Sequence, residues 1–211
     1  MVALASSAVG TVDRRSLGGL ALVVVLTAQL VVVLDFSIVN VALPNISHAL
    51  LVSSTSVQWV VTAYAITFGG LLVLGGRAAD VLGRRRLFVA GLIGFAVASA
   101  SGGVATSFPL LVTARAAQGI AAAAVAPAAL SILTTSFVDG PARTRVLGYY
   151  SVMASVGFVL GLVLGGLLVE TVDWQGVFFV NVPICLIGAA AALHVLPPDV
   201  DTGPRVHLDL P

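Results

Sequence analysis

The stretch from Leu17 to Leu43, LGGLALVVVLTAQLVVVLDFSIVNVAL, decides the fold of this chain. It is apolar along its length and carries one charged residue, Asp35. A bilayer core about 30 Å thick is crossed by a helix of roughly 20 apolar residues. The stretch is therefore long enough to span a membrane, and its length and its aspartate argue against a cleaved signal peptide.

Five more apolar stretches follow along the 211 residues. They cover approximately residues 57–76, 87–106, 109–137, 146–169 and 176–196. Of all residues, 59% are hydrophobic and 9% are charged, whereas a soluble domain carries about 25% charged residues. The sequence predicts an all-α membrane protein, a six-transmembrane-helix bundle over 17–197, with an N-terminal segment at 1–16 and a tail at 198–211.

The basic residues, all arginines, indicate the orientation of the bundle. Apart from Arg115, they flank the spans on one side: Arg14, Arg15, Arg77, Arg84, Arg85, Arg86, Arg143, Arg145 and Arg205. The opposite loops, around residues 44–56, 103–108 and 170–175, hold none. Cytoplasmic loops carry the excess of arginine. Both termini are therefore expected in the cytoplasm, and the expected location is the plasma membrane.

Two charged residues lie inside predicted spans, Asp35 and Arg115. A charge at this depth costs at least about 2.5–3.5 kcal/mol and usually faces a cavity or a partner. At about 1.5 Å per residue, both lie roughly 10 Å below the outer boundary. Gln118 shares a helix face with Arg115, because positions i and i+3 are neighbours. The functional interpretation is a substrate or proton site, and the alternative is a structural ion pair.

The fifth span carries a series of glycines: Gly148, Gly157, Gly161, Gly165 and Gly166. Spacings of four residues form a GxxxG ridge suited to close contact between helices. Two interpretations stay open, a packing ridge and a hinge-like helix that moves.

The segment between the second and third spans holds the densest cluster of charge. It includes Gly76, Asp80, Gly83, Arg84 and Arg85 and is expected to be an inner loop. Anchoring at the cytoplasmic face explains the arginines but not the aspartate. A carboxylate at this place is positioned to meet Arg84 or the positive N-terminus of a neighbouring helix.

A weak internal repeat accompanies this segment. The glycine pair ending at Gly76 precedes Asp80, and the pair ending at Gly166 precedes Glu170 with the same spacing. The pattern favours two inverted three-helix repeats, spans 1–3 and spans 4–6, as in many transporters.

Four segments resemble one known family. They are Leu34 to Pro44, Gly76 to Arg85, Arg115 to Gly119, and Phe178 to Pro183. Together they are similar to the drug:proton antiporter branch of the major facilitator superfamily, which has fourteen spans (EmrB/QacA type). The similarity covers the N-terminal half of that fold. The chain departs from the family at Leu162, where the antiporter motif of the fifth span normally has proline.

The resemblance implies proton-coupled export of small drug-like, amphipathic or cationic compounds by alternating access. It assigns proton or cation coupling to Asp35, modulated by Arg115 with Gln118, and an inner gate to Asp80 with Arg84. The expected partners are the lipid bilayer, a small-molecule substrate and a missing C-terminal half. The alternative is a truncated or split half-transporter that has no activity alone and acts as an assembly partner or remnant.

Other function classes find little support in the sequence. No nucleophile–base pair or cluster of metal ligands is evident, and the single cysteine, Cys185, lies in an apolar run. An enzyme, a metal site and a nucleic-acid partner are therefore not expected. The proton gradient is expected to replace any cofactor.

Overall fold

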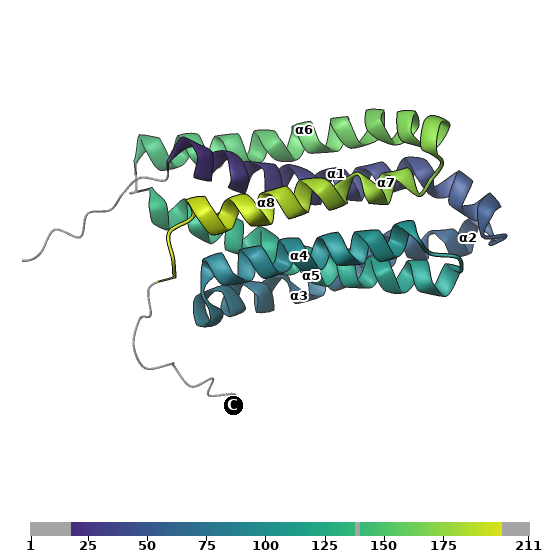
Figure 1. Ribbon diagram of the computed structural model, residues 1–211, viewed down its shortest axis with the longest axis horizontal. Coiled ribbons are helices and arrows are strands. Elements are labelled where there is room, and N and C mark those ends of the chain that lie inside the picture. Colours follow the sequence, from purple (N-terminus) through teal and green to yellow (C-terminus); the bar gives the residue numbers. More distant parts are fainter. Residues whose placement is uncertain (1–17, 138–139, 200–211) are drawn as a thin grey trace, which may run out of the picture.

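The computed structural model describes residues 18–137 and 140–199, and within these ranges the regular structure is entirely helical (Figure 1). The helices are α1 (Gly19–Ala49), α2 (Ser54–Val57), α3 (Trp59–Leu82), α4 (Arg84–Gly103), α5 (Phe108–Ser136), α6 (Pro141–Val172), α7 (Gly176–Phe179) and α8 (Asn181–Val195). Six spans are long and apolar enough to cross a membrane, with α2 and α3 forming one span and α7 and α8 another. A helix satisfies its own backbone hydrogen bonds, which lipid requires. The predicted six-helix bundle is confirmed.

Several helices extend beyond the predicted spans. Helix α1 continues through Pro44 to Ala49, α3 continues to Leu82, and α6 begins at Pro141. Hydropathy marks only the part of a helix that lies in lipid. The helical backbone itself continues into the polar region until a turn residue or a cap ends it.

The prediction of an inner loop between the second and third spans is wrong, because this segment is helical. Gly76 and Asp80 belong to the last turns of α3, and Arg84 and Arg85 begin α4. Only Gly83 separates the two helices, with a φ of 95°. Because this left-handed conformation is readily adopted only by glycine, the chain reverses direction at a single residue.

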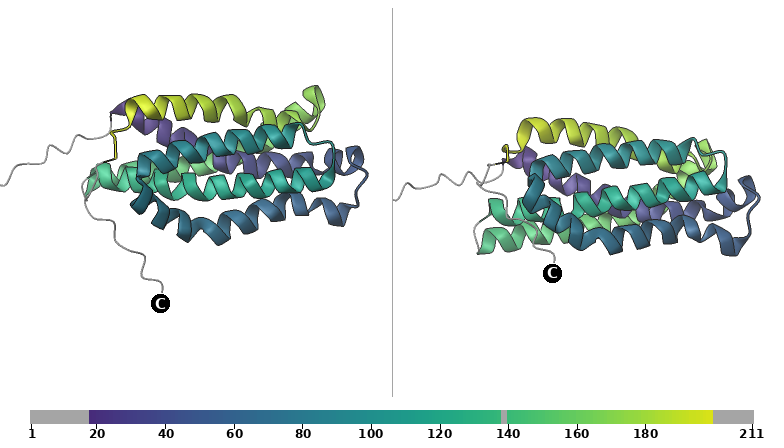
Figure 2. Two further views of the ribbon diagram at one scale, coloured as in Figure 1. Left: turned by 60° about the horizontal axis from the view of Figure 1, so that its bottom comes forward. Right: turned by 90° about the horizontal axis from the view of Figure 1, so that it is seen from below.

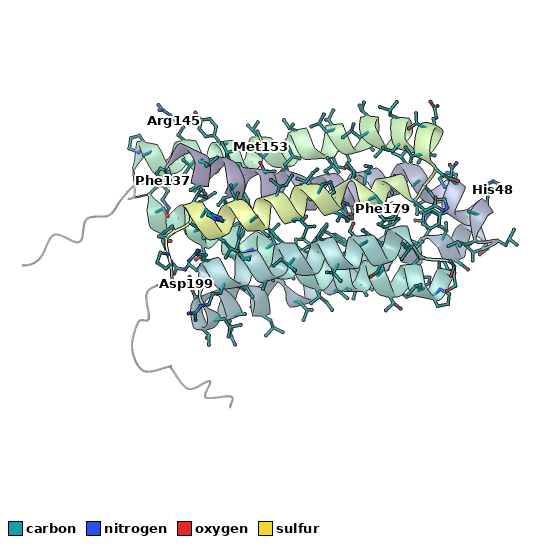
Figure 3. All side chains as sticks on the ribbon, viewed as in Figure 1. His48, Phe137, Arg145, Met153, Phe179 and Asp199 are labelled. Carbon is teal, nitrogen blue, oxygen red and sulfur yellow. The ribbon has the colours of Figure 1, made fainter. Side chains whose placement is uncertain are left out.

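Both described ends of the chain lie at the same end of the bundle (Figure 1). Arg145 and Asp199 lie at this end, and His48 lies at the opposite end (Figure 3). We call the end that holds Arg145 and Asp199 the arginine-bearing end. The predicted segment 1–16 and residues 200–211 of the predicted tail lie outside the described residues.

The pairing of helices follows the predicted inverted repeat. Helix α1 packs along α6, and α3 packs along α5. In the repeat, α1, α3 and α4 of the first half correspond to α5, α6 and α8 of the second half. The α1–α6 contact therefore corresponds to the α5–α3 contact, and the α4–α5 contact corresponds to the α8–α1 contact. Helices α4 and α8 also pack together, and α8 lies on the opposite face of the bundle from α3 (Figure 2, right).

Glycines bring α6 close to the backbone of α1. A Cβ on Gly161 would lie 2.7 Å from the Leu34 carbonyl oxygen, and one on Gly157 would lie 2.6 Å from the Leu30 carbonyl oxygen. Gly165 makes the same approach one turn further along, where its Cβ would lie 3.0 Å from a carbonyl oxygen of α1. These three glycines form the contact ridge between α6 and α1.

Two glycines from the same predicted set do not pack. A Cβ on Gly148 or Gly166 would meet nothing within 4 Å among the described residues. Gly148 lies before the ridge, and Gly166 points away from it, because adjacent positions on a helix face about 100° apart. Neither of these two glycines takes part in the contact between α6 and α1.

Replacing Gly161 by alanine is expected to destabilise the bundle by about 1–3 kcal/mol, because the added Cβ overpacks the α1 contact. The matched change Gly166→Ala is expected to be neutral or to stabilise by up to about 1 kcal/mol, because alanine favours helix. Thermal unfolding in detergent, followed by circular dichroism, measures the difference. Equal midpoints for the two variants would contradict the close approach of α6 to α1.

Candidate functional site

A buried polar network lies within the bundle. Its members are fully shielded from solvent and come from four helices: Asp35 from α1, Ser99 from α4, Arg115 and Gln118 from α5, and Asn181 from α8. Since buried polar groups need partners, these side chains must satisfy one another. The network connects helices from both halves of the repeat.

An ion pair forms the centre of the network. Arg115 Nη1 donates to Asp35 Oδ2 at 2.6 Å, and neither side chain is exposed. Arg115 Nε donates to the Val60 carbonyl oxygen at 3.0 Å, and its guanidinium lies 4.4 Å from the centre of the Tyr64 ring. A cation over an aromatic face is attracted to it. Helix α3 therefore also holds the arginine in place.

Gln118 links the ion pair to α4. Its Oε1 accepts from Arg115 Nη1 at 2.8 Å, and its Nε2 donates to Asp35 Oδ1 at 3.1 Å and to Ser99 Oγ at 3.0 Å. Arg115 and Gln118 can act together because they are three residues apart on one helix face. Every hydrogen-bonding atom of the Gln118 carboxamide is thus in use.

Asn181 contributes a third side-chain donor to the carboxylate. Its Nδ2 lies 2.8 Å from Asp35 Oδ1. Ser99 in turn donates to the Phe178 carbonyl oxygen of α7 at 2.9 Å, close to the interruption at Val180 that separates α7 from α8. The Asp35 carboxylate therefore accepts from Arg115, Gln118 and Asn181, and hydrogen bonds to the ionised form stabilise its charge.

Small residues allow the helices to approach the arginine. Gly119 lies against α3, where an added Cβ would be 2.5 Å from the Tyr64 carbonyl oxygen. Buried alanines continue along the same helix: Ala114, Ala121, Ala122 and Ala123. Close approach places the Val60 carbonyl and the Tyr64 ring within reach of Arg115.

Asp35, Arg115 and Gln118 were singled out from the sequence, and the structure brings them together. Asn181 and Ser99 were not among the predicted site residues, because only the charged side chains in the spans and Gln118, the helix-face neighbour of Arg115, entered the prediction. A carboxamide inside an apolar helix was the available signal for Asn181, since polar side chains in membrane helices usually hydrogen-bond across to another helix. Ser99 offered little signal, because serine commonly bonds within its own helix.

A second polar cluster lies at the arginine-bearing end. Asp80 pairs with Arg84 at 3.4 Å, and both side chains are substantially exposed. The two oxygens of Asp199 accept from the backbone N–H of Arg85 at 2.9 Å and of Arg86 at 3.1 Å. The N-terminus of α4 is therefore capped by Asp199, not by Asp80.

A second contact of Arg85 also joins the start of α4 to the region at the end of α8. The Arg85 guanidinium donates to the carbonyl oxygen of Leu193 in the last turn of α8. Gly83 also approaches the segment after α8, where an added Cβ would lie 2.5 Å from Asp199 Cγ. The start of α4 and the end of α8 are thus joined. Within the described part of the chain, the hydrogen bonds of this cluster do not reach Asp35.

Replacing Asp199 by alanine is expected to cost about 1 kcal/mol, the typical value of a helix cap. The amide protons of Arg85 and Arg86 should then exchange faster with deuterium, because they lose their acceptors. Asp80→Ala is the control, since an exposed ion pair contributes about 0–1 kcal/mol. Hydrogen-exchange mass spectrometry of α4 separates the two variants. Unchanged exchange in Asp199→Ala would rule out the cap.

Metal binding has no candidate site among residues 18–137 and 140–199. No group of three or more His, Cys, Asp or Glu side chains is placed there to hold an ion. The polar network is built from amides, a hydroxyl, a carboxylate and a guanidinium, of which only the carboxylate can take up a proton.

Comparison with known proteins identifies the family. The model of the Major Facilitator Superfamily matches residues 25–207, which include nearly all of the bundle. The chain belongs to the Major Facilitator Superfamily. The resemblance inferred from the sequence motifs is confirmed, and this family is one of transporters, not of enzymes.

Several relatives of this chain are named for resistance to, or export of, a particular compound. The puromycin resistance protein of Streptomyces alboniger is 50% identical over 190 residues, which are 90% of this chain and 38% of that protein. The cephamycin export protein of Amycolatopsis lactamdurans is 44% identical over 207 residues, 98% of this chain and 43% of that protein. The facilitator chain therefore spans about two-fifths of the length of these relatives.

A solved structure supports the fold. A bacterial homologue of the human lysosomal transporter Spinster, in an inward-facing and occupied conformation, superposes with a TM-score of 0.75. The alignment covers 89% of this facilitator chain and 45% of that one, with 20% sequence identity. The chain is a multi-pass membrane protein with the fold of this transporter superfamily.

Proposed function

We propose that this chain forms one half of a proton-coupled exporter of small drug-like compounds, which works by alternating access. The observation that carries the proposal is the fully buried Asp35 carboxylate, bound to Arg115 at 2.6 Å and to amides of two further residues. An ionisable group at membrane depth is costly, and its retention is characteristic of proton and substrate pathways.

The ion pair offers a physical route to coupling. Breaking the pair would leave two buried charges without compensation. Binding of a proton to Asp35 removes one of them, so proton binding and separation of α1 from α5 favour each other. In the proposed cycle, Gln118 remains with Arg115 and the carboxyl group exchanges its proton with water.

The relatives support the substrate class. One is named for puromycin resistance, one for cephamycin export and a third, 37% identical over 190 residues, for lincomycin resistance in Streptomyces lincolnensis. These names refer to three different compounds. We therefore propose a small organic antibiotic-like compound as the substrate of the complete exporter.

The exposed faces of two helices support a second half. Only 17% of the residues are buried in the most apolar stretch of α6, and the same share is buried in that of the α2–α3 span. The corresponding share is 50–56% for α1, α4 and α5. The exposed side chains of α6 include Val156, Phe158, Val159 and Val163. We propose that a C-terminal half covers part of these faces and that lipid covers the rest.

The proposal assigns roles to the remaining elements. The arginine-bearing end faces the cytoplasm of a plasma-membrane protein, with both termini inside, in agreement with the excess of arginine in cytoplasmic loops. The Asp80–Arg84 pair acts as an inner gate. The ridge of Gly157, Gly161 and Gly165 allows α6 to slide on α1 during the transition, since glycines permit close helix contact.

Reconstitution tests the proposal. The chain would be co-expressed with the complementary half of its exporter and inserted into liposomes that contain a pH-sensitive dye. When substrate is added in the presence of an imposed proton gradient, vesicles that hold the complete assembly should release protons. Vesicles that hold this chain alone should release none. Substrate-independent proton signals in the complete assembly would refute proton-coupled export, and transport by the chain alone would refute the need for a second half.

A further inference from the structure

Two atoms of the buried network have no hydrogen-bond partner among the described residues, Arg115 Nη2 and Asn181 Oδ1. The first belongs to a guanidinium that stacks on the Tyr64 ring at 4.4 Å, so an aromatic face is its neighbour. The carboxamide oxygen of Asn181 has no such contact. A buried polar atom without a partner costs about 1–3 kcal/mol, and its presence calls for a physical reason.

The hydrogen bonds around Asp35 match its ionised form. Oδ2 accepts from Arg115 Nη1, and Oδ1 accepts from both Gln118 Nε2 and Asn181 Nδ2. A carboxylate oxygen can only accept, which orients the Asn181 carboxamide with its nitrogen toward Asp35. A proton bound to Oδ1 would turn this atom into a donor that faces two N–H donors. One of these partners must then change.

Gln118 is not free to change. Its Oε1 already accepts from Arg115 at 2.8 Å, and its Nε2 donates to Ser99 at 3.0 Å. Turning its carboxamide would place the Nε2 donor of Gln118 against the Nη1 donor of Arg115. It would also lose the donation to Ser99 Oγ.

Asn181 is free to change. Apart from its bond to Asp35, its Nδ2 has only two long contacts of 3.4 Å, to Ser99 Oγ and to the Val177 carbonyl oxygen. Its Oδ1 is the one unused side-chain oxygen acceptor in the described network. A half-turn about the last side-chain bond exchanges the two atoms with little movement, since this torsion is broad and nearly two-fold.

We propose that Asn181 is a positioning residue that turns its carboxamide when Asp35 binds a proton. Nδ2 donates to the ionised carboxylate, and Oδ1 accepts from the protonated acid. The proton comes from water, forms an O–H bond at Asp35 Oδ1 and changes no other covalent bond. The unpaired oxygen of the ionised state is thus the acceptor reserved for the protonated state. This inference rests on the proposed proton role of Asp35.

The surroundings of Asp35 contain few other groups that titrate. Those that interact with it electrostatically are Arg115 from α5, Tyr64 from α3 and Cys185 from α8. Helix α4 presents the Ser99 hydroxyl, and α6 presents its glycine ridge. Asn181 is therefore the adjustable neutral partner of the carboxyl group.

Infrared difference spectroscopy tests the proposal. The full chain, labelled with asparagine carrying 13C in the side-chain carbonyl, is placed in lipid nanodiscs and compared at alkaline and acidic pH. Acidification should produce a protonated carboxyl band that is lost in Asp35→Asn. The labelled carbonyl band of Asn181 should shift to lower frequency at the same pH, because it gains a hydrogen bond, and this shift should also be lost in Asp35→Asn.

Substitutions of asparagine assign the labelled band. The shift should vanish in Asn181→Leu and persist in Asn45→Leu, a change at an exposed position of α1. The chain has one more asparagine, Asn40. If Asn181→Leu does not fold, persistence of the shift in both Asn40→Leu and Asn45→Leu assigns it to Asn181.

The outcomes separate this inference from the proposed function. A carboxyl band from Asp35 without a shift of the Asn181 carbonyl would overturn the turning carboxamide and leave the proton role of Asp35 intact. Absence of any Asp35 carboxyl band throughout the pH range in which circular dichroism shows folded helices would overturn both.

Discussion

Replacing Arg115 by methionine is expected to lower the free energy of unfolding by about 3–5 kcal/mol, the usual effect of removing one partner of a buried ion pair. Methionine fills much of the same volume but leaves the Asp35 carboxylate, fully buried, without its counter-charge. The Val60 carbonyl and the Gln118 carboxamide also lose a donor. Denaturant titration in mixed micelles, followed by the fluorescence of the buried Trp174, measures the change.

Two further variants control this measurement. Arg84→Met removes an exposed arginine from the pair with Asp80 and is expected to change stability by about 0–1 kcal/mol. The double variant Asp35→Leu with Arg115→Met should recover most of the loss, because apolar replacement of a whole buried pair is often neutral or stabilising. A single Arg115→Met variant as stable as the unmodified chain would show that the pair is solvated.

Asparagine in place of Asp35 is expected to abolish uphill, proton-driven export by the complete transporter while downhill movement of substrate remains measurable. Asparagine has the shape of aspartate and keeps a carbonyl that accepts hydrogen bonds, but it cannot take up and release a proton. The effect should be a loss of coupling, not a reduced rate. Substrate accumulation in everted vesicles, with and without an imposed proton gradient, measures the two modes separately.

Glu170→Gln is the matched control for this loss. Glu170 is an exposed carboxylate near the end of α6, outside the network, and its neutralisation should leave gradient-driven accumulation unchanged. Undiminished proton-coupled export by Asp35→Asn would remove Asp35 from the mechanism.

Most of the fold could be predicted because hydropathy and arginine placement are local properties of the sequence. Helix ends were predicted less well. Pro44 lies within α1, beyond the end of the predicted first span, and the segment around Asp80 continues α3, where an inner loop was expected. A helix can leave the bilayer without ending, and hydropathy does not record the difference.

The site was only partly predictable for a related reason. The cost of burying charge identified Asp35 and Arg115, and helix periodicity added Gln118. Asn181 lies 146 positions from Asp35, and Asp199 caps a helix that begins more than a hundred positions earlier. Partners so distant in sequence are chosen by the packing of α8 against α1 and α4, which no local pattern describes.

The pairing of α1 with α6, and of Asp35 with Arg115, has a consequence for biogenesis. The aspartate and the arginine are 80 positions apart, so the ribosome delivers the first helix to the translocon well before the fourth. During that interval the carboxyl group has no guanidinium to meet, and an uncompensated charge in a lipid-like environment is costly. The first helix therefore gains the counter-charge for its buried aspartate only when the fourth helix has been inserted and packs beside it.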